Sequence, residues 1–109
     1  MMTTFDDRER AFESIYARDQ ELQFKIAARR NRLLGTWAAE LMGLTAVEAE
    51  AYAKDVVRAD FEEAGDEDVI RKLLGDLTSA GVDIDESRIR EALEAKQVEA
   101  RRQFIEAQS

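Results

Sequence analysis

The amino-acid sequence predicts an all-α fold, a four-helix bundle with a long N-terminal helix whose first part projects from the bundle or is flexible. The chain of 109 residues contains no proline and only five glycines, so few positions interrupt a helix. Apolar residues recur at helical spacings in four segments. Each segment starts or stops at a capping residue or a glycine, the connections are short, and no stretch alternates in the manner of a strand.

The first predicted helix covers residues 3–42, with Thr4 as its N-cap and Gly43 just past its C-terminus. Its second half carries apolar residues on one face, which is typical of a helix that packs in a core. These residues are Leu22, Ile26, Leu33, Trp37 and Leu41. Gly35 lies among them, and two roles are open for it: a close approach to another helix beside Trp37, which is the simpler, or a hinge.

The first half of this helix is more densely charged than the second. Its apolar residues are Phe5, Phe12, Ile15 and Tyr16, and acidic and basic residues stand between them. The polar pair Asp19 and Gln20 separates the two halves. We therefore divide the chain into an N-terminal segment of residues 1–18 and a four-helix bundle of residues 19–109.

The second predicted helix has the clearest start signal. Thr45 and Glu48 have the spacing of a capping box, in which each side chain accepts a hydrogen bond from the other residue's backbone amide. The helix is predicted to run to about residue 63 and to stop at Gly65. Its inward face is predicted to consist of small and β-branched residues with one aromatic: Val47, Ala49, Ala53, Val56, Val57 and Phe61.

The last two helices are also bounded by caps. Asp66 is the predicted cap of a third helix that ends at residue 79 before Gly81, with Val69, Ile70, Leu73, Leu74 and Leu77 as its apolar side. Asp85 is the predicted cap of the fourth helix, and Ile84 is predicted to pack on Ile89 as a hydrophobic staple. The apolar face of this helix continues through Leu93, Ala100 and Phe104.

The composition argues against several classes of function. A net charge of −8 disfavours nucleic acid and anionic lipid as partners. No apolar run approaches the roughly 20 residues of a membrane span, and the N-terminus lacks the cationic and apolar regions of a signal peptide. Without cysteine or histidine there is no thiolate and no imidazole base. The acidic residues at 60–68 lack the spacing of a calcium loop. We expect neither an enzyme nor a metal site.

A cluster of basic residues interrupts this acidic sequence, since residues 20–34 hold four bases and one acid. One hypothesis is that the cluster faces Glu62 and Glu63, at a helix end where negative charge is unfavourable. The other is weak binding of ATP or ADP through Arg29, Arg30 and Arg32, because guanidinium groups match phosphate oxygens. No glycine-rich phosphate loop accompanies the arginines, and no other cofactor is predicted.

Three interpretations are open for residues 1–18. Their apolar residues could pack within the bundle, as in an ordinary bundle helix. A membrane-surface helix is disfavoured, because residues 1–19 hold five acids and three bases. The third interpretation is a helix that enters a groove on another protein, with Phe5, Phe12, Ile15 and Tyr16 as anchors.

Several blocks of sequence resemble the zeta subunit family of the alphaproteobacterial F-type ATP synthase, and together they span nearly the whole chain. The first is Thr3-Thr4-Phe5-Asp6-Asp7-Arg8-Glu9. The next are Ala28-Arg29-Arg30-Asn31-Arg32-Leu33-Leu34-Gly35 and Trp37-Ala38-Ala39-Glu40. The last are Tyr52-Ala53-Lys54 and Ala59-Asp60-Phe61-Glu62-Glu63-Ala64-Gly65-Asp66-Glu67-Asp68-Val69.

The resemblance implies a non-catalytic inhibitor subunit, cytoplasmic and peripheral to the inner membrane through the synthase, and a monomer when free. Its N-terminal helix would enter a catalytic α/β interface near the γ rotor and block ATP hydrolysis. The residues that would contact the α, β and γ subunits are Thr4, Phe5, Asp6, Asp7, Arg8, Glu9, Phe12, Ile15 and Tyr16. The alternative is a regulatory or assembly module that binds adenine nucleotide weakly and has reduced or lost inhibition.

Overall fold

The computed structural model describes the backbone of residues 4–62 and 66–108 and the side chains of residues 20–60 and 66–106. The described chain forms four helices: α1 (Thr4–Leu41), α2 (Ala46–Glu62), α3 (Asp66–Ser79) and α4 (Glu86–Gln108). Within the described residues there is no strand. The all-α, four-helix prediction is therefore confirmed, and each helix begins and ends within a few residues of its predicted bounds.

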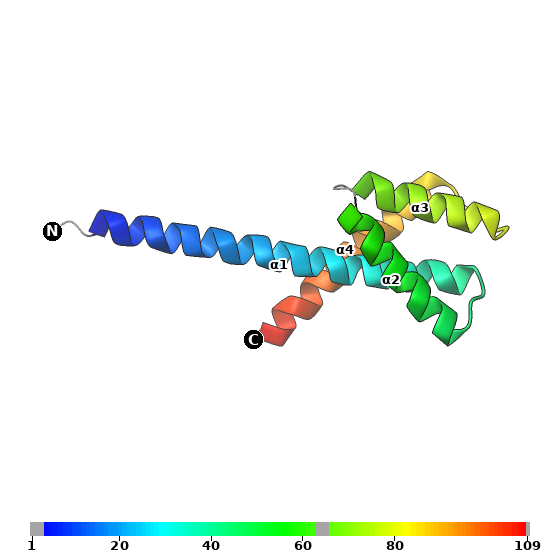
Figure 1. Ribbon diagram of the computed structural model, residues 1–109, viewed down its shortest axis with the longest axis horizontal. Coiled ribbons are helices and arrows are strands. Elements are labelled where there is room, and N and C mark those ends of the chain that lie inside the picture. Colours follow the sequence, from blue (N-terminus) through cyan, green and yellow to red (C-terminus); the bar gives the residue numbers. More distant parts are fainter. Residues whose placement is uncertain (1–3, 63–65, 109) are drawn as a thin grey trace.

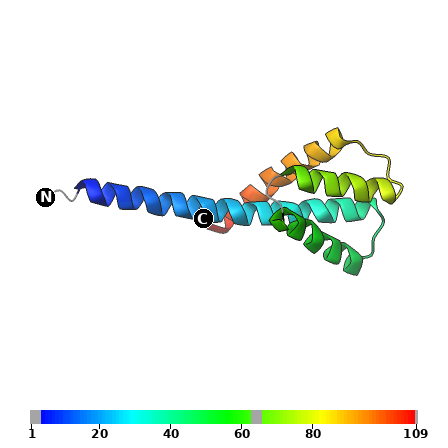
Figure 2. The ribbon, with the colours of Figure 1, turned by 45° about the horizontal axis from the view of Figure 1, so that its top comes forward.

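The second half of α1 is the centre of the molecule. It contacts all three other helices, most extensively α2 and α4. The first half of α1 extends away from the other helices, and α4 runs back beside α1 so that its C-terminal end lies near the base of this extension (Figures 1 and 2). The molecule is consequently elongated, with extents of 68 × 27 × 21 Å.

Local sequence signals set the helix ends. Thr45 N donates to Glu48 Oε1 at 2.9 Å and Glu48 N donates to Thr45 Oγ1 at 3.2 Å, which confirms the capping box. Asp85 Oδ1 accepts from Arg88 N at 2.9 Å and caps α4. Helices α1 and α3 each end two residues before a glycine, Gly43 and Gly81, whose φ angles of 73° and 82° suit glycine.

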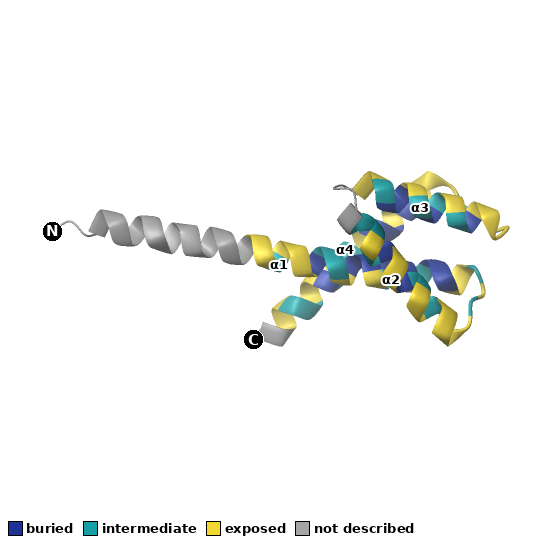
Figure 3. Cartoon of the chain, in the orientation of Figure 1, coloured by how far each residue is buried: buried dark blue, intermediate teal, exposed yellow. Residues whose placement is uncertain are grey.

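The core forms where α1, α2, α3 and α4 meet (Figure 3). The predicted apolar side of α3 is confirmed, with four of its residues buried and Leu74 packed against the core. On α4, Ile89, Leu93 and Ala100 are buried as predicted, and Ile84 packs on the core. Burial of these side chains supplies the main stabilisation of a chain without disulfides.

On α1 the buried face differs from the predicted stripe. The core residues are Ile26, Leu34, Ala38 and Ala39, whereas Leu33 and Trp37 are half-buried and Leu41 is 44% exposed. The reason is that α2 packs closely on the small residues of α1. A Cβ atom added to Gly35 would lie 2.7 Å from the Cα of Ala53 in α2. The close-approach role of Gly35 is therefore confirmed.

On α2 the inward face is shorter than predicted. Ala53 and Val56 are buried, and Ala49 and Val57 are half-buried. Val47 is 79% exposed, so its predicted place on the inward face is wrong. It lies in the first turn of α2 and is not among the described residues that form or pack against the core. The side chain of Phe61 lies outside the described residues.

Candidate functional site

The predicted partner-binding residues all lie on the extended half of α1. The backbone of residues 4–19 is helical and continuous with the packed half of the helix, and it leads away from α2, α3 and α4 (Figure 1). We call residues 4–19 the arm. The side chains of the predicted anchors Phe5, Phe12, Ile15 and Tyr16 lie outside the described residues.

The three arginines predicted to bind nucleotide stand in different environments. Arg29 and Arg32 are exposed, whereas Arg30 is 5% exposed. Residues three apart share a side of a helix, and the two residues between them point elsewhere. The structure therefore brings Arg29 and Arg32 together on one surface and places Arg30 in the interior.

Arg30 connects three helices through its guanidinium group. Its Nη2 lies 3.0 Å from Oδ1 of Asp66, the first residue of α3, and its Nη1 donates to Oε1 of Gln97 in α4 at 3.4 Å. Its Nε and Nη2 both donate to Asn31 Oδ1, at 3.0 and 2.9 Å. The predicted pairing with Glu62 and Glu63 involves side chains outside the described residues. The carboxylate that Arg30 contacts is Asp66, which was predicted to act as a cap.

Asn31 has no exposed surface, and its Nδ2 has no hydrogen-bond partner among the described residues. The amide cannot be turned round, because Arg30 is only a donor and needs the carbonyl oxygen of Asn31. A buried donor without a partner costs roughly 1–3 kcal/mol. Asn31 also lines a hollow of about 50 Å³ together with Phe24, Val57 and Asp60. The residue that carries this unsatisfied donor thus lines a small cavity.

Next to this cavity lies a larger basic surface that runs across α1 from α2 to α4. It consists of two hollows of about 380 and 280 Å³ that share Arg32 and Val57. We call them together the basic groove. Five cationic side chains of the described residues line it: Lys25, Arg29, Arg32, Lys54 and Arg58. The apolar part of the lining is Ala28, Val57 and Phe104.

The cations of the basic groove are held loosely. Arg32 and Lys54 each lie 3.9 Å from Oε1 of Glu50, and Arg58 lies 3.8 Å from Asp55. Lys25 lies 3.5 Å from Glu21. All of these side chains are more than half exposed, and such ion pairs contribute at most about 1 kcal/mol each. Five bases and three partner acids leave an excess of two positive charges.

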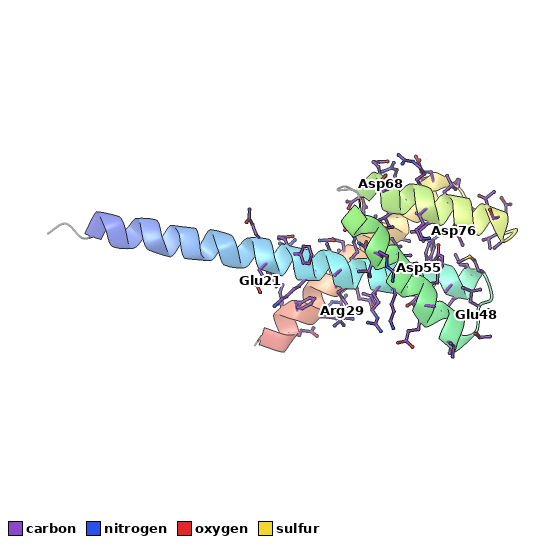
Figure 4. All side chains as sticks on the ribbon, in the orientation of Figure 1. Glu21, Arg29, Glu48, Asp55, Asp68 and Asp76 are labelled. Carbon is purple, nitrogen blue, oxygen red and sulfur yellow. The ribbon has the colours of Figure 1, made fainter. Side chains whose placement is uncertain are left out.

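Arg29 differs from the other four cations because none of the described carboxylates pairs with it. Its Nη1 donates to Gln103 Oε1 at 3.0 Å, and its guanidinium carbon stands 5.6 Å from the centre of the Phe104 ring. Figure 4 shows Arg29 where the C-terminal part of α4 passes α1. Helix α4 thereby positions this arginine beside the base of the arm and leaves its charge available to an anion.

The described residues contain no arrangement suited to covalent or acid–base catalysis. Tyr52 donates to Asp76 Oδ2 at 2.7 Å, and Lys72 donates to the same oxygen at 3.1 Å. Burial, together with the hydrogen bond to Asp76, raises the pKa of Tyr52, so its hydroxyl stays protonated. Within the described chain no three carboxylates gather as a metal site. None of the helices searched in that part has the length and hydrophobicity to cross a membrane.

Sequence reasoning missed much of the basic groove. Lys54 and Arg58 come from α2 and Phe104 from α4, far along the chain from Arg29. The spacing of Lys54 and Arg58, four residues apart, does place both on one side of a helix. Nothing in the sequence indicates that this side meets Arg32. No pattern in the sequence predicts that Asn31 is buried.

These features define a small all-α, four-helix protein with a long, extended first helix and no catalytic site among its described residues. A sequence model of the family described as ATPase inhibitor subunit zeta matches residues 2–103. The chain therefore belongs to the ATPase inhibitor subunit zeta family. This assignment confirms the resemblance found in the sequence and associates the chain with ATP synthase.

The chain is also similar to a structure determined in solution by NMR. The two share 48% sequence identity with a TM-score of 0.69, over 79% of this chain and 98% of the other. No curated protein matches the chain.

Proposed function

We propose that this protein is a non-catalytic inhibitor subunit of the F-type ATP synthase. The arm inserts into a catalytic α/β interface near the γ rotor and blocks ATP hydrolysis. The observation that carries the proposal is the continuity of α1, whose helix extends beyond the bundle with the family's N-terminal sequence on it. Thr4, Phe5, Asp6, Asp7, Arg8, Glu9, Phe12, Ile15 and Tyr16 are the proposed contact residues.

The shape of the molecule supports this mechanism. A single helix is roughly 10–12 Å wide with its side chains, so it fits a slot between two subunits. The molecule as a whole measures 27 × 21 Å across its long axis. The bundle of residues 19–109 is too wide for the same slot and limits how far the segment of residues 1–18 enters.

The energetics come from helix-in-groove recognition. Phe5, Phe12, Ile15 and Tyr16 recur along the arm at spacings that place apolar side chains along one side of a helix. Buried aromatic anchors supply most of the affinity of such contacts, and charged residues form the rim. The protein binds the catalytic head as a monomer on the cytoplasmic side, peripheral to the inner membrane, and contacts the α, β and γ subunits.

The test is steady-state ATP hydrolysis by the cognate synthase, titrated with the full chain and with a chain that lacks residues 1–18. The full chain inhibits hydrolysis, and the truncated chain does not. Circular dichroism of the truncated chain checks that the bundle remains folded. Two single substitutions, Phe12→Ala in the arm and Val98→Ala at an exposed residue of α4, compare the contribution of the arm to inhibition with that of the bundle surface. Inhibition by the truncated chain at the potency of the full chain would contradict the proposal.

A second candidate function is weak binding of adenine nucleotide, and the basic groove favours it. Arg29 and Arg32 line the groove beside Lys25, where guanidinium and ammonium groups could hold phosphates. Arg30 would act indirectly, since its guanidinium is occupied by Asp66, Gln97 and Asn31. NMR shift changes on addition of ATP or ADP should cluster at the groove and disappear in Arg29→Ala/Arg32→Ala. Shift changes elsewhere, or their persistence in this variant, would contradict the assignment.

A further inference from the structure

We infer that the basic groove docks an acidic segment of the same protein that receives the arm, so that the subunit is held at two places. This inference rests on the proposed function, because it requires that the arm enter a partner. It assigns a binding role to the bundle. In the insertion mechanism alone, the bundle only limits how far the arm enters.

The position of the groove follows from the continuity of α1. Lys25, Arg29 and Arg32 stand on the same helix as the arm, a few turns further along. At 1.5 Å per residue, Arg29 is about 16 Å from residue 18 along the axis. A protein that encloses the arm and continues about 16 Å further along the helix would therefore reach the groove without any rearrangement of α1.

The charge of the groove selects the partner. The chain carries a net charge of −8, yet the groove holds five bases and only three acids that pair with them. The pairs with Glu50 are 3.9 Å long and exposed, so carboxylates of a partner could replace them at little cost. Arg29 pairs with no described carboxylate, and although its Nη1 donates to Gln103, the other side of its guanidinium group can bind one. Complementarity of this kind fits an acidic protein segment.

The small hollow lined by Asn31 narrows where a partner's carboxylates can lie. It shares Ala28 and Val57 with the groove, and Asp60 also lines it. A carboxylate would be repelled by Asp60, so the acidic side chains of the partner are expected at Arg29 and Arg32.

The structure of the groove favours a protein segment over a phosphate. Its lining residues stand inside α1, α2 and α4 and not at a helix N-terminus. Backbone amides of helix interiors are already hydrogen-bonded, so the groove lacks the free N–H groups that usually hold phosphates. Carboxylates spread along a segment match cations that are spread over two helices.

The experiment is inhibition of ATP hydrolysis by the cognate synthase with three full-length proteins. These are the wild type, the groove variant Arg29→Glu/Lys54→Glu, and the control variant Arg71→Glu/Arg88→Glu. The control changes the net charge equally, and its residues are exposed on α3 and α4 outside the groove. Thermal unfolding checks that all three are folded.

We expect the groove variant to need at least about a tenfold higher concentration for half-inhibition, and the control less than about twofold. Raising the salt concentration should weaken inhibition by the wild type and by the control variant. Inhibition by the groove variant should change least. Equal potency of the groove variant and the wild type would overturn the inference and leave the proposed function intact. Absence of inhibition by the wild type would overturn both. Loss of nucleotide-induced NMR shifts in a groove variant of unchanged potency would assign the groove to nucleotide.

Discussion

Gly35 of α1 lies directly against Ala53 of α2. A Cβ atom on Gly35 would stand 2.7 Å from the Cα and 3.3 Å from the Cβ of Ala53, and 3.2 Å from Cγ2 of Val56. Real Cβ atoms are not found 2.7 Å from a backbone carbon, so one helix would have to move. The contact also sets the position of Val57 and Arg58, which follow on α2 and line the basic groove.

Gly35→Ala should therefore lower the free energy of unfolding by about 1–3 kcal/mol through overpacking. The direction is opposite to helix propensity, which favours alanine by about 1 kcal/mol. Urea unfolding followed by circular dichroism measures the change.

Gly75→Ala is the matched control, because Gly75 is also inside a helix but nothing lies within 4 Å of its added Cβ. This variant should be more stable than the wild type by about 0.5–1 kcal/mol. If Gly35→Ala stabilises the protein as much as Gly75→Ala does, the helices are not in close contact.

The Arg30–Asp66 pair joins α1 to the start of α3, and its charges differ in exposure. The side chain of Arg30 is 6% exposed and that of Asp66 is 53% exposed. Asp66→Asn should lower the free energy of unfolding by about 1–2 kcal/mol, because the buried guanidinium loses its countercharge.

A double-mutant cycle with Arg30→Met separates this pair from the general effect of charge at a helix start. In the Arg30→Met background, Asp66→Asn should lower the free energy of unfolding much less. Asp83→Asn, at an exposed carboxylate between α3 and α4, should change stability little. Equal costs of Asp66→Asn in the two backgrounds would rule out the coupling.

Thr45→Ala should destabilise the protein by about 1 kcal/mol, because the amide of Glu48 loses its acceptor at the start of α2. Thr45→Ser keeps the hydroxyl and should be nearly neutral. The backbone amide of Thr45, which donates to the carboxylate of Glu48, lowers the pKa of Glu48, and the side chain of Thr45 adds a smaller lowering. An NMR titration of Glu48 should accordingly show its pKa below 4.5 in the wild type and closer to that value in Thr45→Ala.

The Glu67–Arg90 pair joins α3 to α4 by two hydrogen bonds, of 3.0 and 2.8 Å. Arg90 lowers the pKa of Glu67, chiefly by these hydrogen bonds, from its ordinary value of 4.5. A carboxyl group with a lowered pKa contributes stability above its unfolded-state pKa and loses that contribution as the pH falls through the folded-state pKa. The stability difference between wild type and Arg90→Gln should hence be present at pH 7 and shrink below pH 4.5.

Heteronuclear NMR titration of Glu67 in both proteins provides the direct measurement. The pKa of Glu67 should rise toward 4.5 in Arg90→Gln, whereas that of Glu48 should not change. A stability difference that is the same at pH 7 and at low pH would show that the pair contributes no charge-dependent stabilisation.

The four helices and most of their ends could be predicted because those signals are local. A capping box such as Thr45–Glu48 and a C-terminal glycine such as Gly43 involve residues within one turn of each other. The buried face of α1 could not be predicted as well. Large residues such as Trp37 and Leu41 suggested one side, whereas the core lies on the side of Ala38 and Ala39.

Only part of the candidate site was accessible from sequence. Arg29 and Arg32 stood out as a basic cluster, and the arm as a charged amphipathic stretch. Lys54, Arg58 and Phe104 join them through contacts between distant segments. These residues come together only because of the way α2 and α4 cross α1. The residue pattern of a single helix does not predict how another helix crosses it.

The sequence by itself determined an acidic, all-α chain, its helix boundaries and its family, because propensities, caps and family motifs are properties of neighbouring residues. Tertiary structure alone decided that Arg30 and Asn31 are buried while Arg29 and Arg32 are exposed. Successive residues of a helix point about 100° apart, so which of four polar neighbours lies inside depends on where the other helices pack. The small residues of α1 allow α2 to approach at Gly35, and that approach places the groove.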